Sequence, residues 1–75
     1  MGMEIQNRHD FEEPIRAVLD KYAQGPWEYC SIEAKALPDG GTRVHYVIHD
    51  AGGNELRTVV ETRPKDGEPT YALEE

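Results

Sequence analysis

The chain has 75 residues, 15 acidic and eight basic side chains, a formal net charge of −7 and one cysteine. This length predicts one domain with a small core, and one cysteine excludes an internal disulfide. The acidic excess argues against direct binding to nucleic acid or to an anionic membrane, because both partners attract clusters of lysine and arginine. The sequence has neither a long apolar run nor a leader-like N-terminus, and we therefore expect a cytoplasmic protein.

The first predicted element is a helix over residues 10–24. Residues 1–9 before it are polar apart from Met3 and Ile5, and predict either a polar tail or a short extra strand. Asp10 and Glu13 resemble a capping box, and Gly25-Pro26 ends the helix. A stripe of apolar residues recurs at helical spacing: Phe11, Ile15, Val18, Leu19 and Tyr22.

Alternating polarity predicts four strands, at residues 27–37, 42–49, 55–63 and 70–73, separated by loops rich in glycine, proline and aspartate. We expect an α+β domain over residues 10–75, with the helix packed on a four-stranded antiparallel meander in the order 1-2-3-4. The predicted register places Ile32, Ile48 and Leu56 in one cross-strand row. The residues expected to face the core are Cys30, Ile32, Ala34, Ala36, Val44, Tyr46, Ile48, Leu56, Thr58, Val60, Thr62, Tyr71 and Leu73, which leaves Val59 and Glu61 facing outward.

Candidate catalytic chemistry is confined to one predicted row, in which Ser31, His49 and Glu55 have the composition of a hydrolase triad. An open sheet face lacks an oxyanion hole and a pocket that excludes water, which favours a cross-strand ladder over catalysis. His45 and His49 lie about 13 Å apart on a strand, too far to share a metal ion. The inward Cys30 is expected to be an inert core thiol. We therefore expect no enzymatic activity and no cofactor.

Two surface features are candidates for partner binding. The carboxylates of Glu12, Glu13, Asp66 and Glu68 could imitate nucleic-acid phosphates and occupy a basic groove on a protein. Trp27 and Tyr29 are predicted on the outward sheet face, where they could anchor a partner or a second copy of the chain. An alternative interpretation places both aromatic residues over the end of the helix or over a sheet edge.

The order of one helix followed by an antiparallel meander resembles the cystatin-like α+β rolls. Residues 15–23 (IRAVLDKYA) are similar to the first helix of the nuclear-transport-factor-2-like superfamily, but the later helices of that family are missing, so its pocket is not expected. In size, acidity and organisation the chain also resembles phage-encoded anti-CRISPR inhibitors, which bind effector complexes and block access to DNA. No functional residue is carried over from these resemblances.

These observations lead to two functional expectations. The first is a non-enzymatic protein-binding module, an acidic inhibitor that mimics nucleic acid and blocks a basic nucleic-acid-binding protein. The second is a small dimeric or ligand-binding domain that uses the outer sheet face around Trp27 and Tyr29. The first depends on the net charge of −7, and the second on the predicted position of the aromatic side chains.

Overall fold

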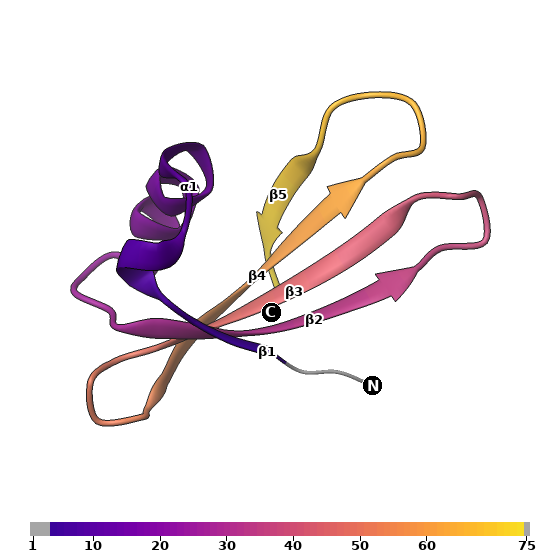
Figure 1. The fold of residues 1–75 in the computed structure, drawn as a ribbon. Coiled ribbons are helices and arrows are strands. Elements are labelled where there is room, and N and C mark those ends of the chain that lie inside the picture. The colour runs from indigo at the N-terminus through magenta and orange to yellow at the C-terminus, as the bar shows by residue number, and fades with distance from the viewer. Residues whose placement is uncertain (1–3, 75) are drawn as a thin grey trace.

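A computed structural model describes residues 4–74 and shows one helix against a five-stranded antiparallel sheet (Figure 1). The strands follow one another across the sheet in the order β1-β2-β3-β4-β5. The helix lies on one face of the twisted sheet, and the other face is open. The elements are β1 (Glu4–Asn7), the 3-10 turn η1 (Arg8–Asp10), α1 (Glu13–Ala23), β2 (Tyr29–Ala36), β3 (Thr42–His49), β4 (Glu55–Arg63) and β5 (Thr70–Leu73).

The predicted number of four strands is wrong, because the chain begins with an additional edge strand. Of the two interpretations for residues 1–9, the extra strand describes residues 4–7, whereas residues 1–3 lie outside the described part. β1 pairs antiparallel with β2, so that Ile5 lies opposite Ser31. The backbone N–H of Arg8 then donates to the carbonyl of Glu28 at 2.9 Å. A strand of four residues is too short to show a clear alternation of polar and apolar side chains in the sequence. β1 forms because β2 offers backbone groups with which it can pair.

The helix begins three residues later than predicted. Its N-cap is Glu12, which makes no side-chain capping bond, while Asp10 belongs to η1. The predicted capping box is therefore not formed. Pro14 occupies the first turn, where its missing N–H breaks no helical bond. At the other end Gln24 adopts a left-handed conformation with φ of 58°, so the chain leaves the helix just before Gly25.

The core lies between α1 and the inner face of the sheet. The predicted inward positions Cys30, Val44, Tyr46 and Ile48 are confirmed as buried. Ala34 and Ala36 are exposed, because β2 and β3 extend beyond the 11-residue helix in Figure 1. The buried apolar residues are Phe11, Leu19, Ala23, Trp27, Cys30, Val44, Tyr46, Ile48 and Val59.

The first hairpin keeps the predicted faces with a different register. Cys30 lies opposite Ile48 and Ile32 opposite Tyr46, a shift of two residues from the predicted pairing. A shift of two residues leaves every side chain on the same face of a strand. The turn closes through the N–H of Leu37, which donates to the carbonyl of Gly41 at 2.9 Å.

The predicted faces of β4 are wrong, because a β-bulge shifts its register by one residue. His49 pairs with Glu55 and Ile48 with Arg57, which leaves Leu56 as the extra residue, 39% exposed. From there Tyr46 pairs with Val59. The positions predicted to face inward from β4, Leu56, Thr58, Val60 and Thr62, therefore do not, and Val59 and Glu61 enter the core instead.

Glu61 is the one carboxylate of residues 4–74 that the structure buries, with 1% of its surface exposed. It accepts hydrogen bonds from the hydroxyl of Tyr46 at 2.7 Å and that of Tyr71 at 2.9 Å, and pairs with Arg63 at 3.0 Å. Burial alone would raise its pKa, but the three donors outweigh burial and hold the pKa below the ordinary value. The inner face thus contains an ionised carboxylate whose oxygens are fully partnered.

Candidate functional site

Trp27 lies in the linker between α1 and β2 and is buried, with 6% of its surface exposed. Its ring packs on Phe11, with 5.9 Å between the ring centroids, and its Nε1–H donates to Asp20 Oδ1 at 2.7 Å. The expected exposure on the outer sheet face is therefore wrong for Trp27. The alternative, in which this side chain packs over the helix, describes the observed position. Binding of a partner near Trp27 remains a prediction.

Asp20 connects the helix to the turn before it. The guanidinium of Arg8 donates Nε–H to Oδ1 at 3.0 Å and Nη2–H to Oδ2 at 2.9 Å. The hydrogen bonds from Arg8 hold the pKa of Asp20 below its ordinary value, against the opposing effect of burial and with a further contribution from Trp27. The Arg8 guanidinium also lies 5.8 Å from the centre of the Trp27 ring. This cluster fixes the linker against α1.

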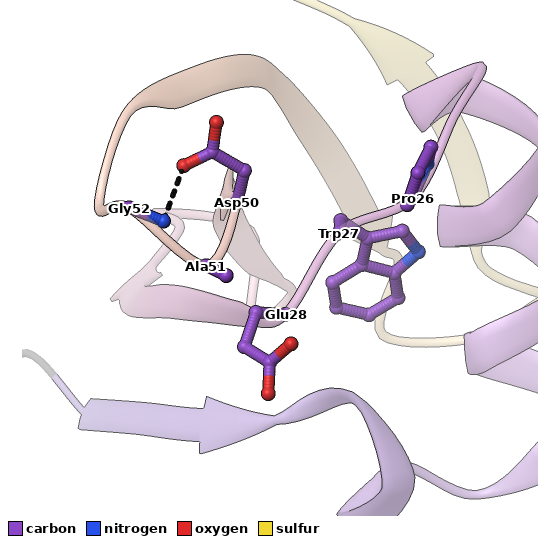
Figure 2. Close-up of a pocket in the computed structure, with 6 residues that line it drawn as sticks. All are labelled: Pro26, Trp27, Glu28, Asp50, Ala51 and Gly52. Carbon is purple, nitrogen blue, oxygen red and sulfur yellow. Dashed lines mark hydrogen bonds between the residues drawn. The ribbon is translucent and has the colours of Figure 1, made fainter.

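A groove with a volume of about 350 Å³ opens beside Trp27. The linker supplies Pro26, Trp27 and Glu28 to one wall, and the loop after β3 supplies Asp50, Ala51 and Gly52 to the other. In Figure 2 the Trp27 ring and the Glu28 side chain extend to the same side of the linker with open space between them. A second hollow of about 370 Å³, lined by Arg8, Asp20, Gly25, Pro26 and Trp27, adjoins this groove.

The loop wall of the groove is held by Asp50. Its Oδ1 accepts the backbone N–H of Gly52 and of Asn54, each at 2.9 Å, and its Oδ2 accepts the Asn54 side-chain amide at 3.2 Å. Hydrogen bonds from Asn54 lower the pKa of Asp50, with a further contribution from Gly52. The Asp50 carboxylate therefore stays ionised and rigid at neutral pH.

The linker wall is fixed through its backbone. The N–H of Glu28 donates to the carbonyl of His49 at 2.8 Å, and the carbonyl of Glu28 accepts from Arg8 at 2.9 Å. These two bonds continue the ladder of the sheet beyond the first residue of β2. The side chain of Glu28 is exposed, and no ion pair of residues 4–74 involves it. Its charge is thus available to a ligand.

The predicted triad row is only partly assembled. Ser31 Oγ lies 3.0 Å from His49 Nε2, which confirms the expected proximity of these two side chains. The other ring nitrogen approaches the carbonyl of Gly53 at 3.4 Å, so a backbone oxygen takes the place expected for Glu55. Tyr29 stacks on His49 with 4.6 Å between centroids and a tilt of 8°. Tyr29 is half-buried at the start of β2, on the open face.

Other chemically active side chains are dispersed. His45 Nε2 lies 3.9 Å from Glu74 Oε1, and its Nδ1 has no hydrogen-bond partner among the described residues. Burial raises the pKa of the Cys30 thiol to about 12, as expected for a core cysteine. Residues 4–74 contain no group of three His, Cys, Asp or Glu side chains that could hold a metal ion.

The predicted partner-binding residues lie at two ends of the sheet. Trp27 and Tyr29 are near the loop that follows β3, whereas Asp66 and Glu68 are in the β4–β5 hairpin. In Figure 1 that loop and that hairpin are at opposite ends of β4. Nine residues of strand separate them by about 30 Å. Glu12 and Glu13 lie at the start of α1, and all four carboxylates are exposed.

Sequence reasoning missed Glu28, Asp50 and Arg8 as members of one region. The Asp50 turn had a local signal, because aspartate followed by glycines and Asn54 is typical of a side-chain-capped turn. Glu28 and Arg8 had none, since their positions depend on the pairing of β1 with β2.

No protein-family model, no curated protein and no solved structure matches the chain. Within residues 4–74, the helix is too short and too polar to cross a membrane.

Proposed function

We propose that the protein is a non-enzymatic binding module that presents an acidic surface to a basic protein partner. The observation that carries this proposal is the placement of charge. Two acidic side chains, Asp20 and Glu61, are each paired with an arginine. Each pair contains one negative and one positive charge, which cancel. The whole net charge of −7 is therefore carried by the other side chains.

The four predicted carboxylates support this proposal. Glu12, Glu13, Asp66 and Glu68 are exposed, and none of the ion pairs within residues 4–74 uses them. Their charges are not compensated locally and remain available to lysine and arginine side chains of a partner. A rigid acidic body of this kind would associate rapidly with a basic surface, and the association would weaken as salt is added.

The test is a tagged pull-down from cell lysate, followed by affinity measurements with the isolated partner. Three double variants each remove two exposed charges: Glu12→Gln with Glu13→Gln, Asp66→Asn with Glu68→Gln, and the matched control Glu33→Gln with Glu55→Gln. We expect the first two to weaken binding by about threefold to tenfold. Equal effects in all three would mean that net charge alone matters, and no effect in any would refute the proposal.

The finer form of the proposal is an inhibitor that mimics nucleic acid, as in the anti-CRISPR proteins that the chain resembles. It requires that the partner bind the protein and duplex DNA at one site. Simultaneous binding of both would exclude the mimic while leaving an acidic binding module.

Two finer descriptions accompany this proposal. The helix laid on an antiparallel meander supports a cystatin-like roll as the fold. The unpaired Cys30 supports a location in a reducing cytoplasm.

A second candidate function, self-association through the open sheet face, is favoured by Ile5. This side chain is 70% exposed and lies opposite Ser31 on that face, in the cross-strand row that continues to Val47 on β3. Association of two copies would cover it. The substitution Ile5→Lys should then lower the apparent mass in sedimentation equilibrium. A monomeric wild-type protein at millimolar concentration would remove this candidate.

A further inference from the structure

We propose that the groove beside Trp27 holds the guanidinium group of an arginine side chain from the partner protein. This inference rests on the proposed function, because it assumes a basic partner, and it assigns one residue type to one site. The groove, defined above by Pro26–Glu28 and Asp50–Gly52, has about 350 Å³. That volume is at the lower end of the range for ligand pockets and suits a single side chain.

The charges around the groove favour a cation. Each wall contributes one acidic residue, Glu28 from the linker and Asp50 from the loop, and in Figure 2 the Asp50 carboxylate is turned toward the backbone N–H of Gly52. The helix α1 ends at Ala23, three residues before Pro26, so its partial negative charge adds to the same region. Arg8, which lines the adjoining hollow, is already paired with Asp20 through two hydrogen bonds. An incoming cation therefore meets an uncompensated negative potential.

The bonding of Asp50 distinguishes a guanidinium from a metal ion. Three donors already occupy its oxygens, from Gly52 and Asn54. The site consequently offers charge and few free ligand positions, whereas a hard metal ion needs six or more oxygen ligands. A guanidinium is planar and weakly hydrated, and it binds beside apolar surface, which the exposed Pro26 supplies here. Glu28, with its free carboxylate, is the expected partner of its N–H groups.

The walls are formed before a ligand arrives. The linker is bonded to His49 and Arg8 through the backbone of Glu28, and the loop is closed by Gly53 N–H donating to the carbonyl of Asp50 at 3.0 Å. Neither wall has to be ordered on binding. The main entropic cost is therefore the loss of conformational freedom of the bound arginine side chain.

The test uses the full chain labelled with ¹⁵N and titrated with N-acetyl-arginine amide at low ionic strength. The single tryptophan makes the Nε1–H signal of Trp27 unambiguous. We expect saturable shifts at Trp27 and at the amides of Ala51 and Gly52, with a dissociation constant in the millimolar range. N-acetyl-citrulline amide, which has the same shape without the charge, should cause none. Absent shifts at these three signals, or equal shifts with citrulline, would overturn the inference.

Two variants complete the design. Glu28→Gln should weaken binding of the arginine probe by about threefold to fivefold, the effect of one exposed carboxylate. Glu33→Gln removes an exposed carboxylate of β2 at a distance from the groove and should leave the affinity unchanged. An unchanged affinity in Glu28→Gln would also overturn the inference.

The outcome is separable from that of the proposed function. The double variants at Glu12 with Glu13, and at Asp66 with Glu68, should leave the arginine titration unaffected. If these variants weaken partner binding while the groove binds no arginine probe, the acidic binding module stands and the groove site fails. If the groove binds the probe and no double variant affects the partner, the failure lies in the proposed function.

Discussion

Replacing Glu61 tests the most tightly constrained group of the fold. Its carboxylate accepts two tyrosine hydroxyls and faces Arg63, with 2% of the side chain exposed. In Glu61→Gln the shape is kept and the charge is lost. The amide oxygen can still accept from Tyr46, and the amide nitrogen can donate to the oxygen of Tyr71. Both hydrogen bonds then become neutral, and Arg63 loses its ion pair and keeps only the neutral amide oxygen as an acceptor.

The size of the effect follows from these contacts. A hydrogen bond to a charged group contributes about 1.5–3 kcal/mol and a neutral one about 0.5–1.5 kcal/mol, so two bonds lose roughly 2 kcal/mol. Arg63 is 49% exposed and can turn to water, so its loss adds little. Relief from burying a charge offsets part of the sum. We expect Glu61→Gln to lower the free energy of unfolding by about 1–2 kcal/mol.

A larger effect is expected for Glu61→Ala. Both tyrosine hydroxyls then lose their acceptor, at about 1–3 kcal/mol each, and a space opens in the core. The expected loss is about 3–5 kcal/mol. A domain of this size has a total stability of about 4–11 kcal/mol, so this variant should be close to unfolding. Glu55→Gln, on the same strand and exposed, is the matched control and should change the stability by less than about 0.5 kcal/mol.

The assay is urea unfolding followed by circular dichroism at several pH values. The pKa of Glu61 is lower in the folded protein than its ordinary value of 4.5. Its ionisation therefore stabilises the wild type above pH 4.5, and this contribution is lost as the pH falls through the lower, folded-state pKa. The difference in stability between wild type and Glu61→Gln should stay constant above about pH 5.5 and shrink on acidification. A difference that stays constant down to pH 3, or is absent at pH 7, would refute the reasoning.

Three further outcomes are expected. Trp27→Phe keeps the ring packing but removes the hydrogen bond to Asp20, and should cost about 1 kcal/mol in urea unfolding; no loss would mean that this bond is not formed in solution. Gly53 has φ of +86°, so Gly53→Ala should lower the free energy of unfolding by about 1–2 kcal/mol. The control Gly52→Ala should be nearly neutral, because the added carbon has its nearest neighbours at 3.5 Å. Equal effects of the two substitutions would contradict the loop geometry. Cys30, with its pKa raised to about 12, should react with iodoacetamide at pH 8 only after unfolding; rapid labelling of the native protein would show that the thiol is accessible.

Local signals in the sequence determined most of the secondary structure. The predicted strands at residues 42–49, 55–63 and 70–73 match β3, β4 and β5, because alternating polarity and turn residues act over a few neighbouring positions. The helix was placed to within three residues by its apolar stripe and by Pro14. The positions of Cys30, Val44, Tyr46 and Ile48 in the core followed from the two-residue repeat of a strand.

The tertiary structure decided which residues of β4 are buried, and with them the chemistry of the interior. The bulge at Leu56 exchanges the two faces of the strand, because side chains alternate and one extra residue reverses them all. No local pattern in the sequence identifies Leu56 as the extra residue of a bulge. The burial of Glu61 is also unexpected from sequence, because glutamate side chains usually lie on the surface. Glu61 is tolerated there because Tyr46, Tyr71 and Arg63 come from other positions to solvate it.

The same division applies to the candidate site. The net charge follows from composition, whereas the groove requires β1 to pair with β2 and the linker to fold over α1. Trp27 shows the difference most clearly, since its sequence neighbours suggested an exposed sheet position. Its burial is decided by Phe11 and Asp20, residues 16 and seven positions away, which only the folded chain brings into contact. Composition is a property of the chain alone, whereas a binding site depends on contacts between distant residues, and these form only on folding.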